Sequence, residues 1–178
     1  MKGNVWILAE QWRGQLSEIS FELLALGREL ADQLGVQLHA VLLGHNAKEL
    51  ARALGKADKV LYADHALLAE PTAEAYAEAL VQLIRAQKPG AVLVPLTNVM
   101  MDAAALVPAQ LGAPFVNWCK GVWTAEGRLQ AGAVLYGGKI EALVGIEAEP
   151  AVLGILPGVR PAENGRSDSV ATVEQASV

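Results

Sequence analysis

Thr97, Asn98 and Asp102 are the polar residues whose types and spacing best fit a ligand-binding site. They follow an aliphatic run that ends at Leu96, and they open a segment with helical spacing. Ligands of open α/β sheets bind beyond the carboxyl ends of the strands, and free N–H groups at a helix N-terminus can hold a phosphate. These three residues are therefore the candidate cofactor-binding residues of the chain.

Helix capping is the alternative role for the same residues. Val99, Met100 and Met101 place bulky side chains where a phosphate-binding loop would have glycine. The carboxylate of Asp102 would also repel an anion. Asn98 or Asp102 could instead cap the following helix, because short polar side chains accept hydrogen bonds from its first N–H groups.

The other reactive residue types predict neither a catalytic site nor a metal site. His39 lies in a predicted strand, His45 and His65 lie in predicted turns, and no pair has the i, i+4 spacing of a helical metal site. The one cysteine, Cys119, has a single neighbouring cation, Lys120, to activate its thiol. We therefore expect Cys119 to be a buried structural residue.

Motifs for phosphate binding and for acyl transfer are absent from the sequence. The chain contains neither G-x-x-x-x-G-K-[ST] nor G-x-G-x-x-G after a strand. Ser17 and Ser20 lack the G-x-S-x-G context of a nucleophilic serine. The side chains of this chain offer no electron carrier, so redox chemistry would depend on a cofactor. We predict that the chain is not itself an enzyme.

The composition indicates a single α/β domain with an aliphatic core. The 178 residues are 53% hydrophobic and only 5% aromatic. A parallel sheet that is covered on both faces is built from such aliphatic strands. The net charge is −5 and no Lys/Arg cluster occurs, which argues against nucleic acid as a partner because phosphate contacts need several cations on one face.

A reducing, aqueous compartment suits this sequence. A single cysteine cannot form an internal disulfide. No apolar run reaches the ~18–20 residues of a membrane-spanning helix, and the first residues, Met1 to Asn4, lack a signal-peptide pattern. The expected location is the cytoplasm, without membrane insertion.

Residues 1–112 alternate strand and helix patterns. Apolar residues recur at helical spacing from Ile19 to Leu34, and Gly35 is suited to end that helix. This alternation favours right-handed crossovers and a mainly parallel sheet. The predicted strands are Val5–Ala9, Val36–Leu43, Lys59–Ala63 and Ala91–Leu96, with helical segments predicted at 17–34, 46–54, 72–87 and 102–111.

Residues 113–158 change to short apolar runs separated by glycine and proline. Gly137-Gly138 suits a tight turn with positive φ, so we expect an antiparallel extension of the sheet. The runs are Phe115–Val116, Lys120–Thr124, Arg128–Tyr136, Ile140–Ile146 and Ala151–Leu156. The predicted fold class is a three-layer α/β/α sandwich with a mainly parallel, Rossmann-like sheet and an antiparallel C-terminal extension.

Residues 162–178 form a polar segment. Residues 162–178 have little apolar pattern and are predicted to be a disordered tail or linker stub after a domain at 1–161.

Trp12 lies in a polar loop and is expected to be exposed. It would contact a partner protein or cover the edge of the sheet.

Four segments occur in the order and spacing of one known family: Gly14–Leu30, Asp58–Asp64, Ala91–Leu111, and Tyr136–Lys139 followed by Ala142. They resemble the first helix, the third strand, the fourth strand with its helix, and the strand-turn-strand of the electron transfer flavoprotein α subunit, amino-terminal domain. Together they extend over residues 4–160.

This resemblance implies an adenine nucleotide alpha hydrolase-like domain that packs against an electron transfer flavoprotein β subunit. In the family, FAD is bound mainly by the domain that follows and by the β subunit, which also holds AMP. The resemblance therefore implies no cofactor on this chain alone, with FAD supplied by another domain or subunit.

The sequence departs from the family pattern where polar or charged groups are usual. A Gly and a basic residue are common after the fourth strand, an Arg occurs later in that helix, an Asp occurs near position 117, and another Arg precedes the Tyr-x-Gly turn. The residues at these places are Met100, Met101, Leu106, Asn117 and the pair Ala131-Gly132.

Three functions follow as hypotheses. The leading one is a non-catalytic docking or structural part of a flavin-dependent electron-transfer assembly, with an electron transfer flavoprotein β-type subunit and/or a flavin dehydrogenase as partner. The alternative is a stand-alone AMP- or ATP-binding protein of universal-stress-like fold. The third is a homodimer, formed through an unpaired sheet edge or the helix at 72–87.

Overall fold

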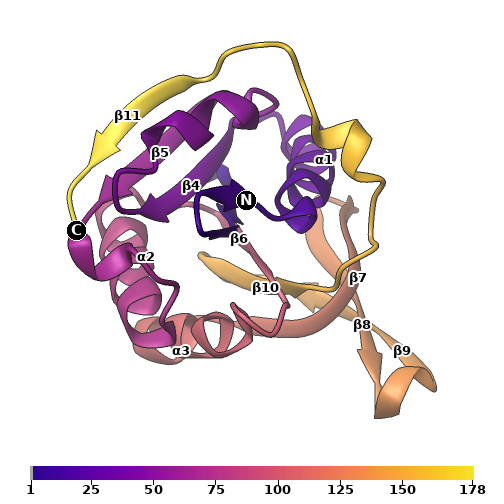
Figure 1. Cartoon of the computed structure of the whole chain (residues 1–178). Helices are drawn as coiled ribbons and strands as arrows, with labels where there is room; N and C mark the ends of the chain where they lie inside the picture. Colours follow the sequence, from indigo (N-terminus) through magenta and orange to yellow (C-terminus); the bar gives the residue numbers. More distant parts are fainter. Residues whose placement is uncertain (1) are drawn as a thin grey trace.

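The aliphatic runs of the amino-terminal half lie side by side at the centre of one sheet. The computed structural model describes residues 2–178 (Figure 1). Its strands are β1 (Val5–Ala9), β2 (Gln11–Trp12), β3 (Gln15–Leu16), β4 (Leu38–Gly44), β5 (Lys59–Asp64), β6 (Ala91–Pro95), β7 (Phe115–Ala125), β8 (Arg128–Leu135), β9 (Ile140–Ile146), β10 (Ala151–Ile155) and β11 (Thr172–Ala176). Its helices are α1 (Glu18–Leu34), α2 (Ala73–Gln87) and α3 (Met101–Leu111), with 3-10 turns η1 (Lys48–Leu54), η2 (Ala66–Leu68), η3 (Tyr136–Gly138) and η4 (Ala162–Gly165).

Nine strands form the main sheet, in the order β11-β5-β4-β1-β6-β10-β7-β8-β9. Every neighbouring pair from β11 to β7 is parallel, and β7, β8 and β9 pair antiparallel. The predicted mainly parallel sheet with an antiparallel extension is confirmed. In Figure 1 the β8–β9 hairpin projects from the body of the domain, and we call β7, β8 and β9 the arm.

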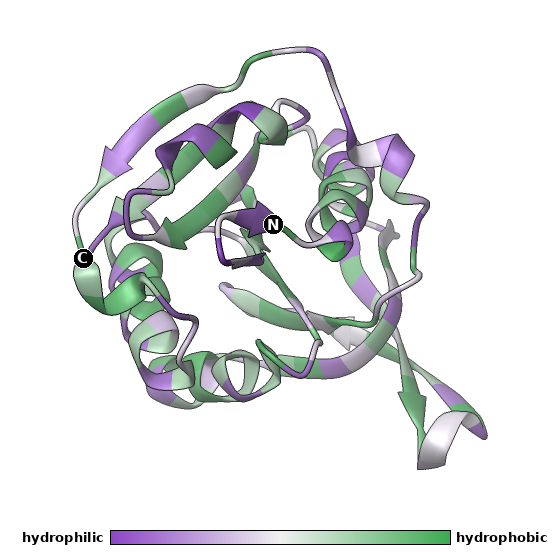
Figure 2. Ribbon diagram, viewed as in Figure 1, coloured by the Kyte–Doolittle hydropathy of each residue, from purple (hydrophilic) through white to green (hydrophobic). Residues whose placement is uncertain are grey.

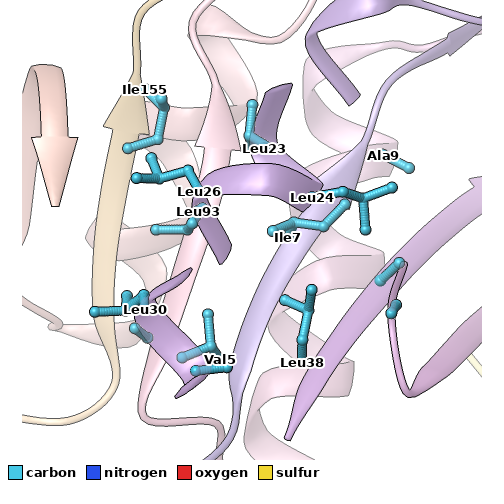
Figure 3. Close-up of a cluster of buried hydrophobic side chains, with 14 of the residues drawn as sticks. Val5, Ile7, Ala9, Leu23, Leu24, Leu26, Leu30, Leu38, Leu93 and Ile155 are labelled. Carbon is cyan, nitrogen blue, oxygen red and sulfur yellow. The ribbon is translucent and has the colours of Figure 1, made fainter. Parts of the chain in front are cut away.

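Helices cover both faces of the parallel strands, which explains why those strands are aliphatic throughout. One face packs against α1, η1 and η4, and the other packs against α2 and α3. Figure 3 shows leucines of α1, including Leu24, Leu26 and Leu30, over Val5 and Ile7 of β1. The three-layer prediction is therefore confirmed, because each strand needs an apolar partner on both faces.

The helices follow their local signals closely. α1 begins after Ser17 and ends at Gly35, whose φ of 67° is the left-handed conformation expected there. α3 continues through Pro108 to Leu111. Among the residues that the structure describes, no helix combines the length and the apolar character needed to cross a bilayer.

The prediction that Ala151–Leu156 belongs to the antiparallel extension is wrong. β10 lies between β6 and β7 and runs parallel to both, with Val152 opposite Val92 and Phe115. All five of its residues are buried. A fully aliphatic strand of this kind is stable where helices cover both of its faces, so it inserts into the parallel sheet rather than extending the arm.

The prediction of a disordered tail at 162–178 is also wrong for most of that segment. η4 packs against α1, and β11 pairs parallel with β5 from Thr172 to Ala176. Figure 1 shows this segment passing around the outside of the domain to the far edge of the sheet. We call residues 161–178 the strap.

Ion pairs and backbone pairing order the strap in place of an apolar face of its own. Arg166 lies 3.9 Å from the centre of the Phe21 ring and 2.6 Å from the Glu18 carboxylate. Lys59 contacts Glu174 at 2.7 Å. Contacts of these types leave little hydrophobic pattern in the sequence, which is why composition alone suggested disorder.

Candidate functional site

The carboxyl ends of β1 and β6 mark the place where this fold would hold a ligand. β4 lies on one side of β1 and β6 lies on the other, so the strand order changes direction there. In open α/β folds this change leaves a crevice outside the ends of the strands. The residues that follow β1 and β6 here are Glu10-Gln11 and Leu96-Thr97.

Glu10 and Thr97 meet directly at the carboxyl ends of these two strands. The Thr97 hydroxyl donates a hydrogen bond to Oε2 of Glu10, whose side chain is only 5% exposed. The same hydroxyl oxygen accepts hydrogen bonds from the N–H groups of Val99 at 3.2 Å and Met100 at 3.1 Å. Thr97 therefore joins the end of β1 to the turn that precedes α3.

The other two predicted site residues lie outside this contact. Asn98 and Asp102 are exposed. No side chain forms a hydrogen bond at the N-cap position of α3, which is Met100, so capping by Asn98 or Asp102 is not found at that position. The structure brings Thr97 into the crevice and leaves Asn98 and Asp102 beside it on the surface. A ligand role for these three residues stays a prediction.

A second polar network lies on the β4 side of β1. The Gln11 amide donates to the Tyr76 hydroxyl at 3.1 Å, and that hydroxyl donates to the carbonyl oxygen of Leu43 at 3.1 Å. Burial raises the pKa of Tyr76 to about 12, so this hydroxyl stays protonated. The network holds α2 against the ends of β1 and β4.

These contacts do not fit the phosphate groups of a nucleotide or of FAD. The N–H of Met101 bonds to the Thr97 carbonyl at 2.9 Å, and the Thr97 hydroxyl already accepts from the two preceding N–H groups. The Glu10 N–H bonds to the Ser20 hydroxyl at 2.9 Å. A bound anion would find these donors engaged and a buried carboxylate beside them, which is unfavourable for negative charge.

Sequence reasoning missed Glu10 and Gln11 as site residues. Both follow the predicted strand Val5–Ala9 and are buried, with 5% and 3% of their side chains exposed. Their position directly after a central strand was the available signal, since that position faces the crevice in this fold class.

His45 and His65 lie on either side of Asp64, at the ends of β4 and β5. Nδ1 of His45 lies 3.2 Å from Oδ1 of Asp64, and Nδ1 of His65 accepts a hydrogen bond from the Leu67 N–H at 3.2 Å. No group of three His, Cys, Asp or Glu residues suitable for a metal ion occurs within residues 2–178.

His39, in contrast, is buried. It is 4% exposed in β4 and stacks on Trp6, with ring centroids 6.4 Å apart. Nε2 lies 3.1 Å from the Gln37 side-chain oxygen, while Nδ1 is buried without a partner. Desolvation, with a further contribution from Lys59, lowers the pKa of His39, and Asp58 and Glu174 oppose this shift.

We expect the free energy of unfolding to fall as the pH decreases from about 7.5 to about 5.5. Because the folded state lowers the pKa of His39, the unfolded chain binds a proton near pH 6.5 that the folded chain resists. This contribution is fully present above pH ~6.5 and is lost at lower pH, with a slope of at most about 1.4 kcal/mol per pH unit. Urea unfolding at a series of pH values measures it.

The matched variants are His39→Gln and His45→Gln. His39→Gln should flatten the pH dependence in this window, and His45→Gln, which removes an exposed histidine, is the comparison. Equal slopes for wild type and His39→Gln would assign the pH dependence to other groups.

Cys119 is buried, as predicted. Burial raises the pKa of its thiol to about 12, so the thiolate that reactive cysteines require is not formed near neutral pH. The Sγ donates to the carbonyl oxygen of Val116 at 3.3 Å. Cys119 is a structural residue of β7.

The residue before Cys119 is exposed because the strand bulges there. The sequence predicts two short runs at 115–116 and 120–124, but β7 is one strand whose pairing shifts register near Cys119. Trp118 has a φ of 58°, an unfavourable value for a bulky side chain. Its N–H donates to Asn117 Oδ1 at 3.0 Å. The bulge turns the indole outward, where it is 48% exposed.

Apolar side chains gather around Trp118 at the end of the arm. Large apolar residues there are 42% to 77% exposed. A cavity of about 620 Å³ lies beside them, lined mainly by Trp118, Val134, Leu135, Tyr136 and Leu156, with Lys120 at its edge. Figure 2 shows apolar stretches on the projecting hairpin. We call Trp118, Leu135, Tyr136 and Ile140 the arm-tip patch.

Trp12 is exposed, as predicted, at 45%. It lies on the short β2–β3 hairpin, which the sequence pattern did not reveal. The Arg13 guanidinium carbon lies 5.9 Å from the centre of its ring. Trp12 therefore lies on a different hairpin from the arm-tip patch.

The sheet order and its covering helices define a Rossmann-like open parallel α/β domain, here with an antiparallel arm. The model of the electron transfer flavoprotein domain matches residues 5–178, and the chain belongs to that family. The resemblance seen in the sequence is thereby confirmed.

Curated relatives carry names from the same family. The chain is 36% identical to the electron transfer flavoprotein subunit alpha of Clostridium acetobutylicum over 88% of this chain and 48% of that protein. It is 37% identical to protein FixB of Clostridium saccharobutylicum over the same shares. It is also 39% identical to the acryloyl-CoA reductase electron transfer subunit beta of Anaerotignum propionicum, over 61% of this chain and 30% of that protein. The chain spans about half the length of the first two relatives.

Proposed function

We propose that this chain is the docking part of a flavin-dependent electron-transfer assembly and is not itself catalytic. Its family and the names of two relatives, an electron transfer flavoprotein subunit alpha and an acryloyl-CoA reductase electron transfer subunit beta, support this proposal. The expected partners are an electron transfer flavoprotein β-type subunit and/or a flavin dehydrogenase. The cytoplasm remains the expected location.

The observation that carries the proposal is the arm-tip patch. Monomeric proteins rarely leave several large apolar side chains together on a projecting element, because water contact with them is unfavourable. Trp and Tyr are the residues that most often anchor protein interfaces. The left-handed backbone at Trp118 holds the indole outward, and such strain is typical of functional positions.

FAD fits the assembly but not the crevice of this chain. Glu10 and the engaged N–H groups around Thr97 oppose a pyrophosphate, so the residues present here would not hold the cofactor. Another domain or subunit would supply FAD and its electron chemistry. In this proposal, the chain contributes a rigid surface against which that domain or subunit docks.

The test is the purified chain, alone and with an electron transfer flavoprotein subunit beta purified separately. We expect no visible flavin absorption from the chain alone and a one-to-one complex with the subunit, detected by light scattering after gel filtration. Stoichiometric flavin bound to the chain alone would refute the proposal. Titration calorimetry with AMP and ATP tests the nucleotide-binding alternative. We expect no binding, whereas micromolar affinity would favour that alternative.

A further inference from the structure

The two edges of the main sheet are protected very differently. On one side, the strap supplies β11, whose outward residues include Thr172, Glu174 and Gln175. On the other side, β9 pairs with β8 alone among the strands of residues 2–178. Its residues Ile140 and Leu143 are 50% and 66% exposed. Natural sheets guard long edges with charge, proline or a covering segment, so an apolar uncovered edge marks a place where another strand pairs.

The sequence of β9 is nearly symmetric about Leu143. Reading outward, Ala142 matches Val144, Glu141 is placed against Gly145, and Ile140 matches Ile146. The next positions are Lys139 on one side and Glu147 on the other, which carry opposite charges. A strand with this symmetry is complementary to an antiparallel copy of itself.

We propose that β9 pairs with β9 of a second copy of this chain, antiparallel and with the two-fold axis at Leu143. This register sets Leu143 opposite Leu143 of the second copy and joins two nine-stranded sheets into one continuous sheet. In this register, two residues that lie opposite each other have sequence numbers that differ by an even number. Because side chains alternate between the two faces of a strand, such residues lie on the same face, and the buried face of one sheet continues into the buried face of the other.

Charge favours this register over two of its alternatives. Lys139 lies opposite Glu147 of the second copy, and the symmetry repeats that pair at the other end. Glu147 also contacts Arg128 of its own chain at 3.3 Å, with both side chains largely exposed, so its carboxylate can contact a second cation. An axis at Glu141 would place Glu141 opposite itself, and an axis at Val144 would place Glu141 opposite Glu147. Like charges directly opposite each other destabilise a strand pair.

This pairing concerns the chain by itself and does not depend on the flavin-carrying partner. Sedimentation velocity over a range of concentrations should show a monomer–dimer equilibrium of the full chain. Leu143→Lys sets two ammonium groups against each other at the axis and should weaken dimerisation at least ~10-fold. Leu67→Lys is the matched control, because Leu67 is an equally exposed apolar residue at 72%, on η2.

Charge reversal tests the register itself. Lys139→Glu alone and Glu147→Lys alone should each weaken the dimer, since each creates two like-charged pairs. The double variant should restore dimerisation, and so should an equimolar mixture of the two single variants. Additive weakening in the double variant would overturn the register.

A disulfide locates the axis directly. Opposite residues in an antiparallel pair have Cα atoms about 4.5–5.5 Å apart, within the span of a disulfide. With oxidised glutathione, Leu143→Cys should form a covalent dimer. Ile140→Cys should not, because two copies of position 140 would be about 20 Å apart along the strands. Cys119 is buried and does not interfere.

Circular dichroism of every variant establishes that the fold is kept. A chain that stays monomeric at all concentrations would refute the proposal, and so would a dimer that Leu143→Lys leaves intact. A chain that is monomeric alone and forms a complex only with an electron transfer flavoprotein subunit beta would refute it too, while leaving the proposed function standing.

Discussion

Gly165→Ala is expected to release the strap from the body of the domain. A Cβ at position 165 would lie 1.8 Å from the carbonyl oxygen of Phe21 and 2.6 Å from its carbonyl carbon. Both are backbone atoms of α1, so neither can move aside as a side-chain end could. The strap must lift instead, which removes the contacts of Arg166 with Phe21 and Glu18. We expect a cost of about 1–3 kcal/mol or more, the range for forced overpacking.

Hydrogen exchange and limited proteolysis measure this release. The backbone amides of β5 that face β11 should exchange faster, and trypsin should cleave after Arg166, which precedes Ser167. Gly55→Ala should give the same result from a separate place, because its Cβ would lie 1.7 Å from the carbonyl oxygen of Ser169. If either change alone already releases the strap, the double variant should cost little more than each single one.

Gly121→Ala is the matched control for both variants. The nearest side-chain atom to a Cβ at position 121 is 3.6 Å away, an ordinary contact. Unchanged exchange and protease resistance in Gly165→Ala would show that the strap does not depend on this close approach.

The second large effect concerns docking through the arm-tip patch. Combined Trp118→Ala and Tyr136→Ala substitutions should weaken binding to an electron transfer flavoprotein subunit beta by about 30-fold or more, the loss typical of removing one hot-spot aromatic residue. Tyr136 is 77% exposed and Trp118 is 48% exposed, so the fold should not depend on either ring. Titration calorimetry measures the affinity, and thermal unfolding checks the fold.

Trp118→Gly separates docking from stability. Glycine adopts a φ of 58° without the cost of about 1–2 kcal/mol that other residues bear there. The free chain should therefore keep its stability or gain some, while the affinity for the partner falls. Leu67→Ala, on η2, should change neither property. Full affinity in Trp118→Gly would place the docking surface elsewhere.

The parts of the fold that the sequence predicted are those with local signals. The spacing from Ile19 to Leu34 and the left-handed Gly35 define α1 because an amphipathic helix carries its pattern within a few turns. The aliphatic runs at β1, β4, β5 and β6 are recognisable for the same reason. The candidate residue Thr97 was found because the end of a central strand is a known position in this fold class.

Long-range pairing accounts for the errors. β10 has the same local pattern as an arm strand, and only its fit between β6 and β7 places it in the parallel sheet. The strap has no apolar periodicity, because one edge strand and several ion pairs hold it. Glu10 and Thr97 are 87 positions apart, so nothing in either local sequence reports their contact.

The sequence by itself determined the family, the layered α/β architecture and the lack of a standard phosphate loop or metal motif, because periodicity and motifs are local properties of a chain. The tertiary structure decided that Glu10 meets Thr97 in the crevice, that the strap guards one edge of the sheet and that the other edge is left open. It also decided that Trp118 faces outward beside Tyr136. Each of these depends on strand order and register, which bring distant residues together through pairings that no short stretch of sequence encodes.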